Sequence, residues 1–464
     1  MKKNKLIFLM MLSAFLFAAQ NCGDDEKALT EDDVNEEIVT SCHGCHSEDS
    51  EIGMKILAAQ AGYDNSGHKN GPRGWIELTD VVYDASGTLQ AGDTTLETLF
   101  HGSNAAYTNA TPCSNCHTHN GFVERVKAGQ MIEKAETDTK EIVVGAPAPI
   151  GCFTCHEPHK NGNFSLRTTN AVTLLVDDTV TFDRGLGNLC VHCHQSRTAA
   201  SSVDTTFATP ATPSGHWGPH HGPQGDFLMG ANGYEFTGKT YSTNDVHYDA
   251  KGDSPANSCV NCHRYTDTNT NGDRYNSNLE TGNHGMYLTA NVHGSMTDRV
   301  DVCWSQCHST DIPDPKPRTA KFTDVKKPAT ADWDGDGTTE TILKETQGLA
   351  DKLYTYFIDP ANFAGTNVGA CNTAPVAGPI ATSGISTKWR LGWDFQAMKN
   401  DWDATASTGT EECVMTKAQA GAFWNFKYYT EDHSGGVHFP TYAAQLLYDS
   451  LEAVGDTTIG ATRP

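Results

Sequence analysis

The sequence predicts a mostly irregular fold of loops and short α-helices wrapped around bound cofactors, followed by a mainly helical C-terminal region. Twelve of the fifteen cysteines form six pairs between residues 42 and 308, and each pair is followed directly by a histidine. This segment is rich in Gly, Asn, Thr, Ser and Pro, a composition typical of loops. Residues 309–464 contain no such pair and carry apolar residues at helical spacing.

Composition excludes two classes of protein. Of the 464 residues 38% are hydrophobic, too few for a protein that crosses a membrane many times. Acidic residues outnumber basic ones by 57 to 33, which gives a net charge of -24. Binding to phosphates needs a basic face, so we expect no nucleic acid as a partner.

The N-terminus predicts export. Three lysines within the first five residues precede an apolar run from Leu6 to Ala19, which is typical of a secretory signal. We assign residues 1–21 to this signal and residues 22–41 to an acidic linker. Cys22 is either the lipid-bearing first residue of a lipoprotein or part of a signal that is cut away. The sequence leaves both open.

Five of the six cysteine pairs read Cys-x-x-Cys-His, the pattern that attaches haem c. The two thiols add across the two vinyl groups of one haem, and the histidine ligates its iron. Random placement predicts about 0.02 such matches, against five observed. Paired cysteines also bind zinc, but zinc needs no histidine after every pair. The residues are Cys42, Cys45 and His46; Cys113, Cys116 and His117; Cys152, Cys155 and His156; Cys190, Cys193 and His194; and Cys259, Cys262 and His263.

The sixth motif has one more residue between its cysteines, Cys303 and Cys307, and ends in His308. Longer spacings are known among multihaem cytochromes, so we predict a sixth haem here. The alternative is a disulfide, or thiols beside a surface histidine. Residues 42–310 then form a hexahaem domain, in which the apolar haem surfaces supply the core that the sequence lacks.

Histidines outnumber the iron positions. Six proximal ligands leave fourteen of the twenty histidines, whereas three of the ten methionines lie in the predicted signal. We therefore expect a second histidine on most irons, giving low-spin haems of low potential. His101 and His247 each stand twelve residues before a motif, and glycines flank His68, His284 and His438. The candidates for the distal position are His68, His101, His119, His159, His216, His220, His247, His284, His293 and His438.

Residues 311–464 are predicted to form a haem-free, mainly helical domain. Apolar residues recur at helical spacing near 342–357, 416–430 and 441–454. We expect this region to cap the haem domain and to return His438 to a haem. The two cysteines of the region, Cys371 and Cys413, form a disulfide in an exported protein, or else remain two buried thiols.

Alternating acidic residues open this region. Asp332, Asp334 and Asp336 precede a glycine, as at the start of a calcium loop. The twelfth position, where such a loop has a bidentate Glu, holds Leu343. A Ca²⁺ site and a solvated Asx-turn therefore both stay open.

The cysteine motifs, the histidines near them and the acidic loop together resemble those of the multihaem c-type cytochromes of metal-respiring bacteria that transfer electrons outside the cell. The resemblance implies short helices wrapped around stacked bis-His c-type haems, and transfer of electrons to or beyond the outer membrane. Some relatives form haem-wired filaments; they often carry Asn where this chain has Phe439. The matching stretches are residues 113–122, 152–159 with 162–164, 216–224, 332–337, and 436–438 with Tyr442.

The leading hypothesis is an electron carrier of six haems without a substrate, acting alone or as a filament subunit. The alternative is an enzyme that reduces a nitrogen or sulfur oxyanion at a haem with an open distal position. No Cys-x-x-Cys-Lys motif, often found in nitrite-reducing relatives, occurs here. Expected partners are other multihaem cytochromes, outer-membrane conduit proteins, further copies of the chain and extracellular metal oxides. The expected location is the outer-membrane surface or the extracellular space, with the periplasm as the alternative.

Overall fold

The structure is a computed structural model of the whole chain. The predicted signal, the linker and Cys22 lie outside the residues that it describes. These residues are 51–70, 114–129, 150–157, 165–211, 217–220, 222–243, 247, 258–265, 282–292, 295–303, 308, 322, 325, 327–358, 362 and 415–464.

The chain divides into two compact units. The first comprises residues 1–168 with 282–286, and the second comprises 169–281 with 287–464. The predicted boundary between residues 310 and 311 does not coincide with this division, because the C-terminal helices belong to the same unit as residues 169–281. The same boundary also separates the predicted haem-binding sequence from the haem-free sequence, and this part of the prediction is not tested by the division into units.

Short helices dominate the described part of the first unit. Helix α9 begins after Thr118, whose hydroxyl accepts a hydrogen bond from the backbone N–H of Gly121 at 3.0 Å. It ends at Gly129, whose φ of +70° is the left-handed conformation that glycine adopts without strain. The helices are α3 (Glu51–Asp64), α4 (Gly67–Asn70), α8 (Ser114–His117), α9 (His119–Ala128) and α10 (Cys152–Cys155).

The second unit begins with a small antiparallel hairpin. Strands β1 and β2 pair Val172 with Phe182, and their inward side chains form a small core with Val191 and Leu228. A second hairpin, β3 with β4, pairs Thr289 with Asp298. The elements are β1 (Val172–Leu174), β2 (Asp177–Phe182), η1 (Gly185–Gly187), α11 (Asn188–Val191), α12 (Ser202–Thr206), α13 (Gln224–Leu228), α14 (Ser258–His263), β3 (Thr289–Val292), β4 (Ser295–Asp298) and α15 (Val300–Cys303).

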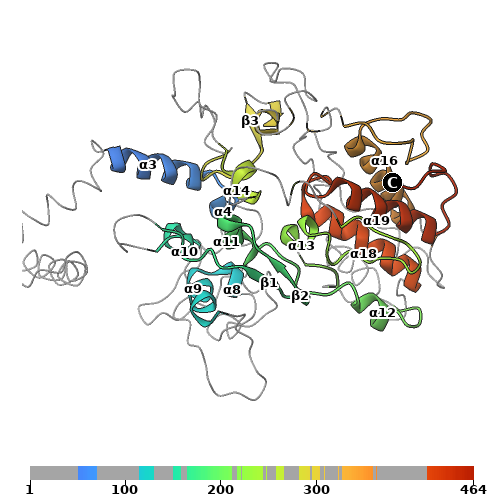
Figure 1. Ribbon diagram of the computed structural model, residues 1–464, viewed down its shortest axis with the longest axis horizontal. Coiled ribbons are helices and arrows are strands. Elements are labelled where there is room, and N and C mark those ends of the chain that lie inside the picture. Colours follow the sequence, from blue (N-terminus) through green and yellow to red (C-terminus); the bar gives the residue numbers. More distant parts are fainter. Residues whose placement is uncertain are drawn as a thin grey trace, which may run out of the picture. The chain divides into compact units, whose positions relative to one another are not determined.

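Three longer helices form the main core of this unit: α16 (Ile342–Ile358), α18 (Lys417–Asp432) and α19 (Pro440–Ala453). Figure 1 shows them packed side by side. A capping box between Thr416 and Gln419 begins α18, and Pro440 occupies the first turn of α19. All three helices lie where the apolar spacing predicts them.

Helix α18 is buried on nearly all sides because residues 217–243 cover the face that α16 and α19 leave open. Asn425 pairs with the backbone of Tyr234, accepting from its N–H at 2.7 Å and donating to its carbonyl at 2.9 Å. Trp424 donates from Nε1 to the carbonyl of Asn232 at 2.9 Å and packs edge-on against Trp217. Phe423 and Trp424 are both fully buried in this core.

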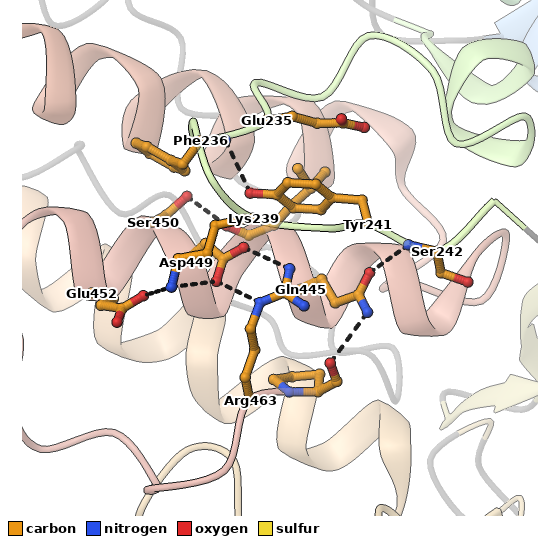
Figure 2. A network of polar contacts seen from close by, with 12 residues as sticks. Glu235, Phe236, Lys239, Tyr241, Ser242, Gln445, Asp449, Ser450, Glu452 and Arg463 are labelled. Atoms are coloured by element: carbon orange, nitrogen blue, oxygen red, sulfur yellow. Dashed lines mark hydrogen bonds and ion pairs between the residues drawn. The ribbon is translucent and has the colours of Figure 1, made fainter.

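A polar network ties the C-terminus to α19 (Figure 2). Arg463 donates two hydrogen bonds, of 2.8 and 2.7 Å, to the two oxygens of the buried Asp449. Lys239 lies 3.8 Å from the same carboxylate and also pairs with Glu452. The Arg463 guanidinium also lies over the ring of Tyr241, 5.1 Å from its centre. The network therefore supplies two cations to one buried carboxylate.

Candidate haem sites

The motifs at Cys152, Cys190 and Cys259 each form a single helical turn. Helix α10 runs from Cys152 to Cys155, and α14 contains Cys259, Cys262 and His263. One turn of helix places residues three apart on the same side, so both thiols of a motif face the same space. The turn at Cys190 follows the same pattern, since the backbone N–H of His194 donates to the carbonyl of Cys190 at 2.9 Å.

Three pairs of histidine rings face each other, and each pair combines one motif histidine with one predicted distal candidate. A metal–imidazole bond is about 2 Å and the ring centre lies roughly 1 Å beyond the nitrogen, so two rings on opposite sides of one iron are about 6 Å apart. The distances between ring centres are 6.2 Å for His156 and His284, 6.4 Å for His308 and His247, and 6.3 Å for His263 and His438. The first pair belongs to the first unit and the other two to the second.

His438 is held by a buried carboxylate. Its Nδ1 lies 2.6 Å from Oδ1 of Asp432, whose side chain is fully buried, and Ser434 donates its hydroxyl to the other oxygen. An ionised carboxylate accepts hydrogen bonds and donates none, so Nδ1 of His438 carries the proton. Nε2 would then be the nitrogen that ligates a metal, as in the carboxylate–histidine–metal arrangement.

His194 is held in the same tautomer by a neutral group. Gln224 donates from Nε2 to the carbonyl oxygens of Glu431 and Asp432, at 3.2 and 3.0 Å. Its Oε1 therefore faces Nδ1 of His194, 2.9 Å away, and accepts a hydrogen bond from it. Burial lowers the pKa of His194, which keeps the ring neutral, the form in which a histidine would ligate iron.

His247 and His284 also fit the ligand role. Burial, followed by the neighbouring His438 and His308, lowers the pKa of His247 to about 4, so the ring is neutral at pH 7. Nδ1 of His284 donates to Oδ1 of Asn283 at 3.0 Å, so Nε2 would be the nitrogen that ligates a metal. A side chain on Gly62 would come within 3.4 Å of the Cβ of His284, so helix α3 packs closely on this turn.

Motifs from distant parts of the sequence are neighbours within each unit. In the second, the thiol of Cys259 is hydrogen-bonded with Cys190, which lowers the pKa of Cys259 to about 7. The approach is close because Gly187 has no side chain; a Cβ there would lie 3.3 Å from Sγ of Cys259. In the first, Nδ1 of His119 lies 3.0 Å from Oγ1 of Thr154 and links α9 to α10.

Other predicted site residues are not placed in such a pair. His68, His119 and His220 are described, and none of them is a member of the three pairs. No disulfide joins the cysteines that the structure describes, including Cys116, Cys193 and Cys303. The predicted site residues outside the described part are Cys42, Cys45, His46, His101, Cys113, His159, His216, His293, Cys307, Cys371 and Cys413.

The predicted calcium loop gathers a different third carboxylate. Oxygens of Asp332, Asp334 and Glu345 all lie within 4.8 Å of one another, and Asp336 is not a member of this group. Glu345 also accepts from the backbone N–H groups of Trp333 at 2.7 Å and Glu340 at 2.7 Å, so it shapes the loop itself. Burial, and then the charges of Glu345 and the other two aspartates, raise the pKa of Asp334 to about 6.

Sequence reasoning did not identify Asp432, Gln224 or Glu345. Asp432 stands six residues before His438, a spacing that carries no general signal for a ligand's partner. Glu345 stands two residues beyond the position that a regular calcium loop uses. Gln224 ends the matching stretch 216–224, but the sequence gives it no role there.

Comparison with known proteins gives no relative, since no family model, curated protein or solved structure matches the chain. In the part of the chain that the structure describes, no helix is both long and apolar enough to span a membrane.

Proposed function

We propose that this protein is an exported multihaem c-type cytochrome that carries electrons through six covalently attached haems. The observation that carries the proposal is the set of three histidine pairs at the spacing of two ligands on one iron. Each pair unites a motif histidine with a histidine from a distant part of the chain.

The pairs support a proposal for three distal ligands. His284 would serve the haem bound at Cys152 and Cys155, and His438 the haem bound at Cys259 and Cys262. His247 would serve the haem of the longer motif, opposite His308. His194 would be the proximal ligand of a fourth haem, oriented by Gln224.

Haem iron supplies one-electron transfer between its ferric and ferrous states. The protein's part is to fill both axial positions and to keep the imidazoles neutral and fixed. Burial keeps the imidazoles of His194 and His247 neutral. Hydrogen bonds from Nδ1 fix the rings of His194 and His438. Filled positions favour transfer of electrons over binding of a substrate.

The net negative charge of the chain determines which partners it can attract. A net charge of -24 favours basic redox proteins or metal cations and oxides over an anionic membrane face. We propose other multihaem cytochromes, outer-membrane conduit proteins and extracellular metal oxides as partners, and further copies of the chain in a filament at the cell surface.

Intact mass of the exported holoprotein tests the proposal. Six haems are expected, and the Cys303→Ala, Cys307→Ala double variant should carry five because it removes the sixth attachment site. The Cys371→Ala variant is the control and should keep all six. A wild-type protein without covalently bound haem would contradict the proposal.

A further inference from the structure

The last turn of α18 organises two of the histidines, with groups of different charge. The carboxylate of Asp432 accepts from Nδ1 of His438, whereas the neutral amide of Gln224 accepts from Nδ1 of His194. Gln224 in turn donates to the carbonyls of Glu431 and Asp432 that end the helix. Both histidines are thus held by groups at the end of α18. The group that accepts from His438 is charged, and the group that accepts from His194 is neutral.

Asp432 is expected to destabilise α18, for two reasons. The C-terminus of a helix carries a partial negative charge, which disfavours an acidic residue there. The Asp432 side chain is also fully buried, which adds a cost for the charge. His438 and Ser434 offset this cost, because both donate to the carboxylate. The position is therefore explained by its contact with His438.

The chain after α18 is shaped for this contact. His433, Gly435 and Gly436 have φ values of +58°, +63° and +92°, a left-handed turn that reverses the chain. The backbone N–H of His438 then donates to Oγ of Ser434 at 3.2 Å. The turn packs against α16 and α19, since a Cβ on Gly436 would lie 3.4 Å from both Thr346 and Ala443. Hydrogen bonds therefore fix both the backbone and the ring of His438.

We infer that Asp432 is a positioning residue that lowers the reduction potential of the haem served by His263 and His438, below that of the haem at His194. A charge-assisted hydrogen bond at Nδ1 makes Nε2 a stronger electron donor, which stabilises ferric iron. The amide of Gln224 gives a weaker effect. The two sites adjoin at Cys190 and Cys259, so electrons would run downhill from the His438 haem to the His194 haem.

This inference rests on the proposed function, and redox titration of the holoprotein by spectroelectrochemistry tests it. Asp432→Asn keeps the size of the side chain and an acceptor oxygen but removes the charge. We expect one haem to become about tenfold easier to reduce, which is about 59 mV for a one-electron couple. Asp432→Glu should restore most of the original potential. Glu452→Gln, which removes a charge elsewhere in the same unit, is the matched control and should leave all potentials in place.

A second variant predicts a change of opposite sign. Ser434→Ala removes the hydroxyl that shares the negative charge of Asp432, so the carboxylate acts more strongly on His438 and the same potential should fall. A purely structural role of this turn would move the potential in the same direction in both variants.

The outcomes separate the two proposals. Six haems with unchanged potentials in Asp432→Asn would overturn this inference and leave the proposed function standing. If Asp432→Asn loads its haems incompletely, Ser434→Ala decides: a lowered potential supports the inference, and an unchanged or raised one overturns it. A wild-type protein without haem would overturn the proposed function itself.

Discussion

The imidazole rings of His263 and His438 face each other with their centres 6.3 Å apart. His263 ends a Cys-x-x-Cys-His motif, whereas His438 lies in the turn between α18 and α19, where no haem motif occurs. If one haem lies between them, the C-terminal helices are part of the haem-binding structure. Their packed core would then fix an axial ligand as well as stabilise the fold.

Replacing His438 should open one iron. In His438→Ala we expect one of six low-spin ferric signals to become high-spin, because no second nitrogen would bind that iron. His433→Asn is the control; this neighbouring side chain is 54% exposed, and Asn tolerates the left-handed backbone at this position. EPR of the oxidised proteins makes the comparison. Equal low-spin intensity in both variants would remove His438 from the ligand set.

The other two pairs should behave independently. His247→Ala and His284→Ala should each convert one low-spin haem to high-spin, and the double variant should convert two, since the pairs belong to different units. EPR intensity combined with the haem count measures this. A single conversion in the double variant would mean that the two histidines do not serve separate irons.

The C-terminal network should contribute to stability. Arg463→Met keeps the apolar stem but removes two hydrogen bonds to the buried Asp449. We expect a loss of about 2 kcal/mol in the free energy of unfolding, below the usual cost of breaking a buried pair because Lys239 remains 3.8 Å away. Lys352→Met, at an exposed hydrogen bond to Thr458, should change it by less than about 0.5 kcal/mol. Urea titration tests both; equal effects would contradict this role of Asp449.

The acidic loop should make stability depend on pH and on calcium. The pKa of Asp334 is raised to about 6 in the folded protein, so the folded state binds a proton more readily than the unfolded state. Without calcium, this carboxyl therefore makes the protein more stable as the pH falls through 6, and less stable as it rises. Ca²⁺ should raise the melting temperature at pH 7, and its effect should shrink toward pH 5.

Two variants check the calcium prediction by calorimetry. Asp334→Asn should lose the effect of Ca²⁺, whereas Asp336→Asn should keep it, because Asp336 is not among the three converging carboxylates. If millimolar Ca²⁺ leaves the melting temperature of the wild-type protein unchanged, the loop is an Asx-turn without a metal.

Local patterns in the sequence predicted local features of the structure. Apolar spacing located α16, α18 and α19, since a helix depends on residues three and four apart. The cysteine motifs that end in His194 and His263 coincide with short helical turns. Neighbouring glycines favoured His68, His284 and His438. The last two are members of a pair, whereas His68 belongs to none of the three pairs.

Contacts between distant residues could not be predicted in this way. The spacing of His247 linked it to the motif at Cys259, but its ring lies opposite His308, a pairing that depends on the path of the chain between them. Asp432 and Gln224 contact His438 and His194 only because α18 ends at Asp432. Glu345 reaches the acidic loop from the first turn of α16, which a fixed loop length does not foresee.

Quantified EPR of the oxidised holoprotein, with its haem count fixed by intact mass, tests the central claim most directly. The account predicts six haems, all low-spin, because histidines fill both axial positions. A substantial high-spin signal in the wild-type protein would contradict the account and favour an enzyme with an open iron.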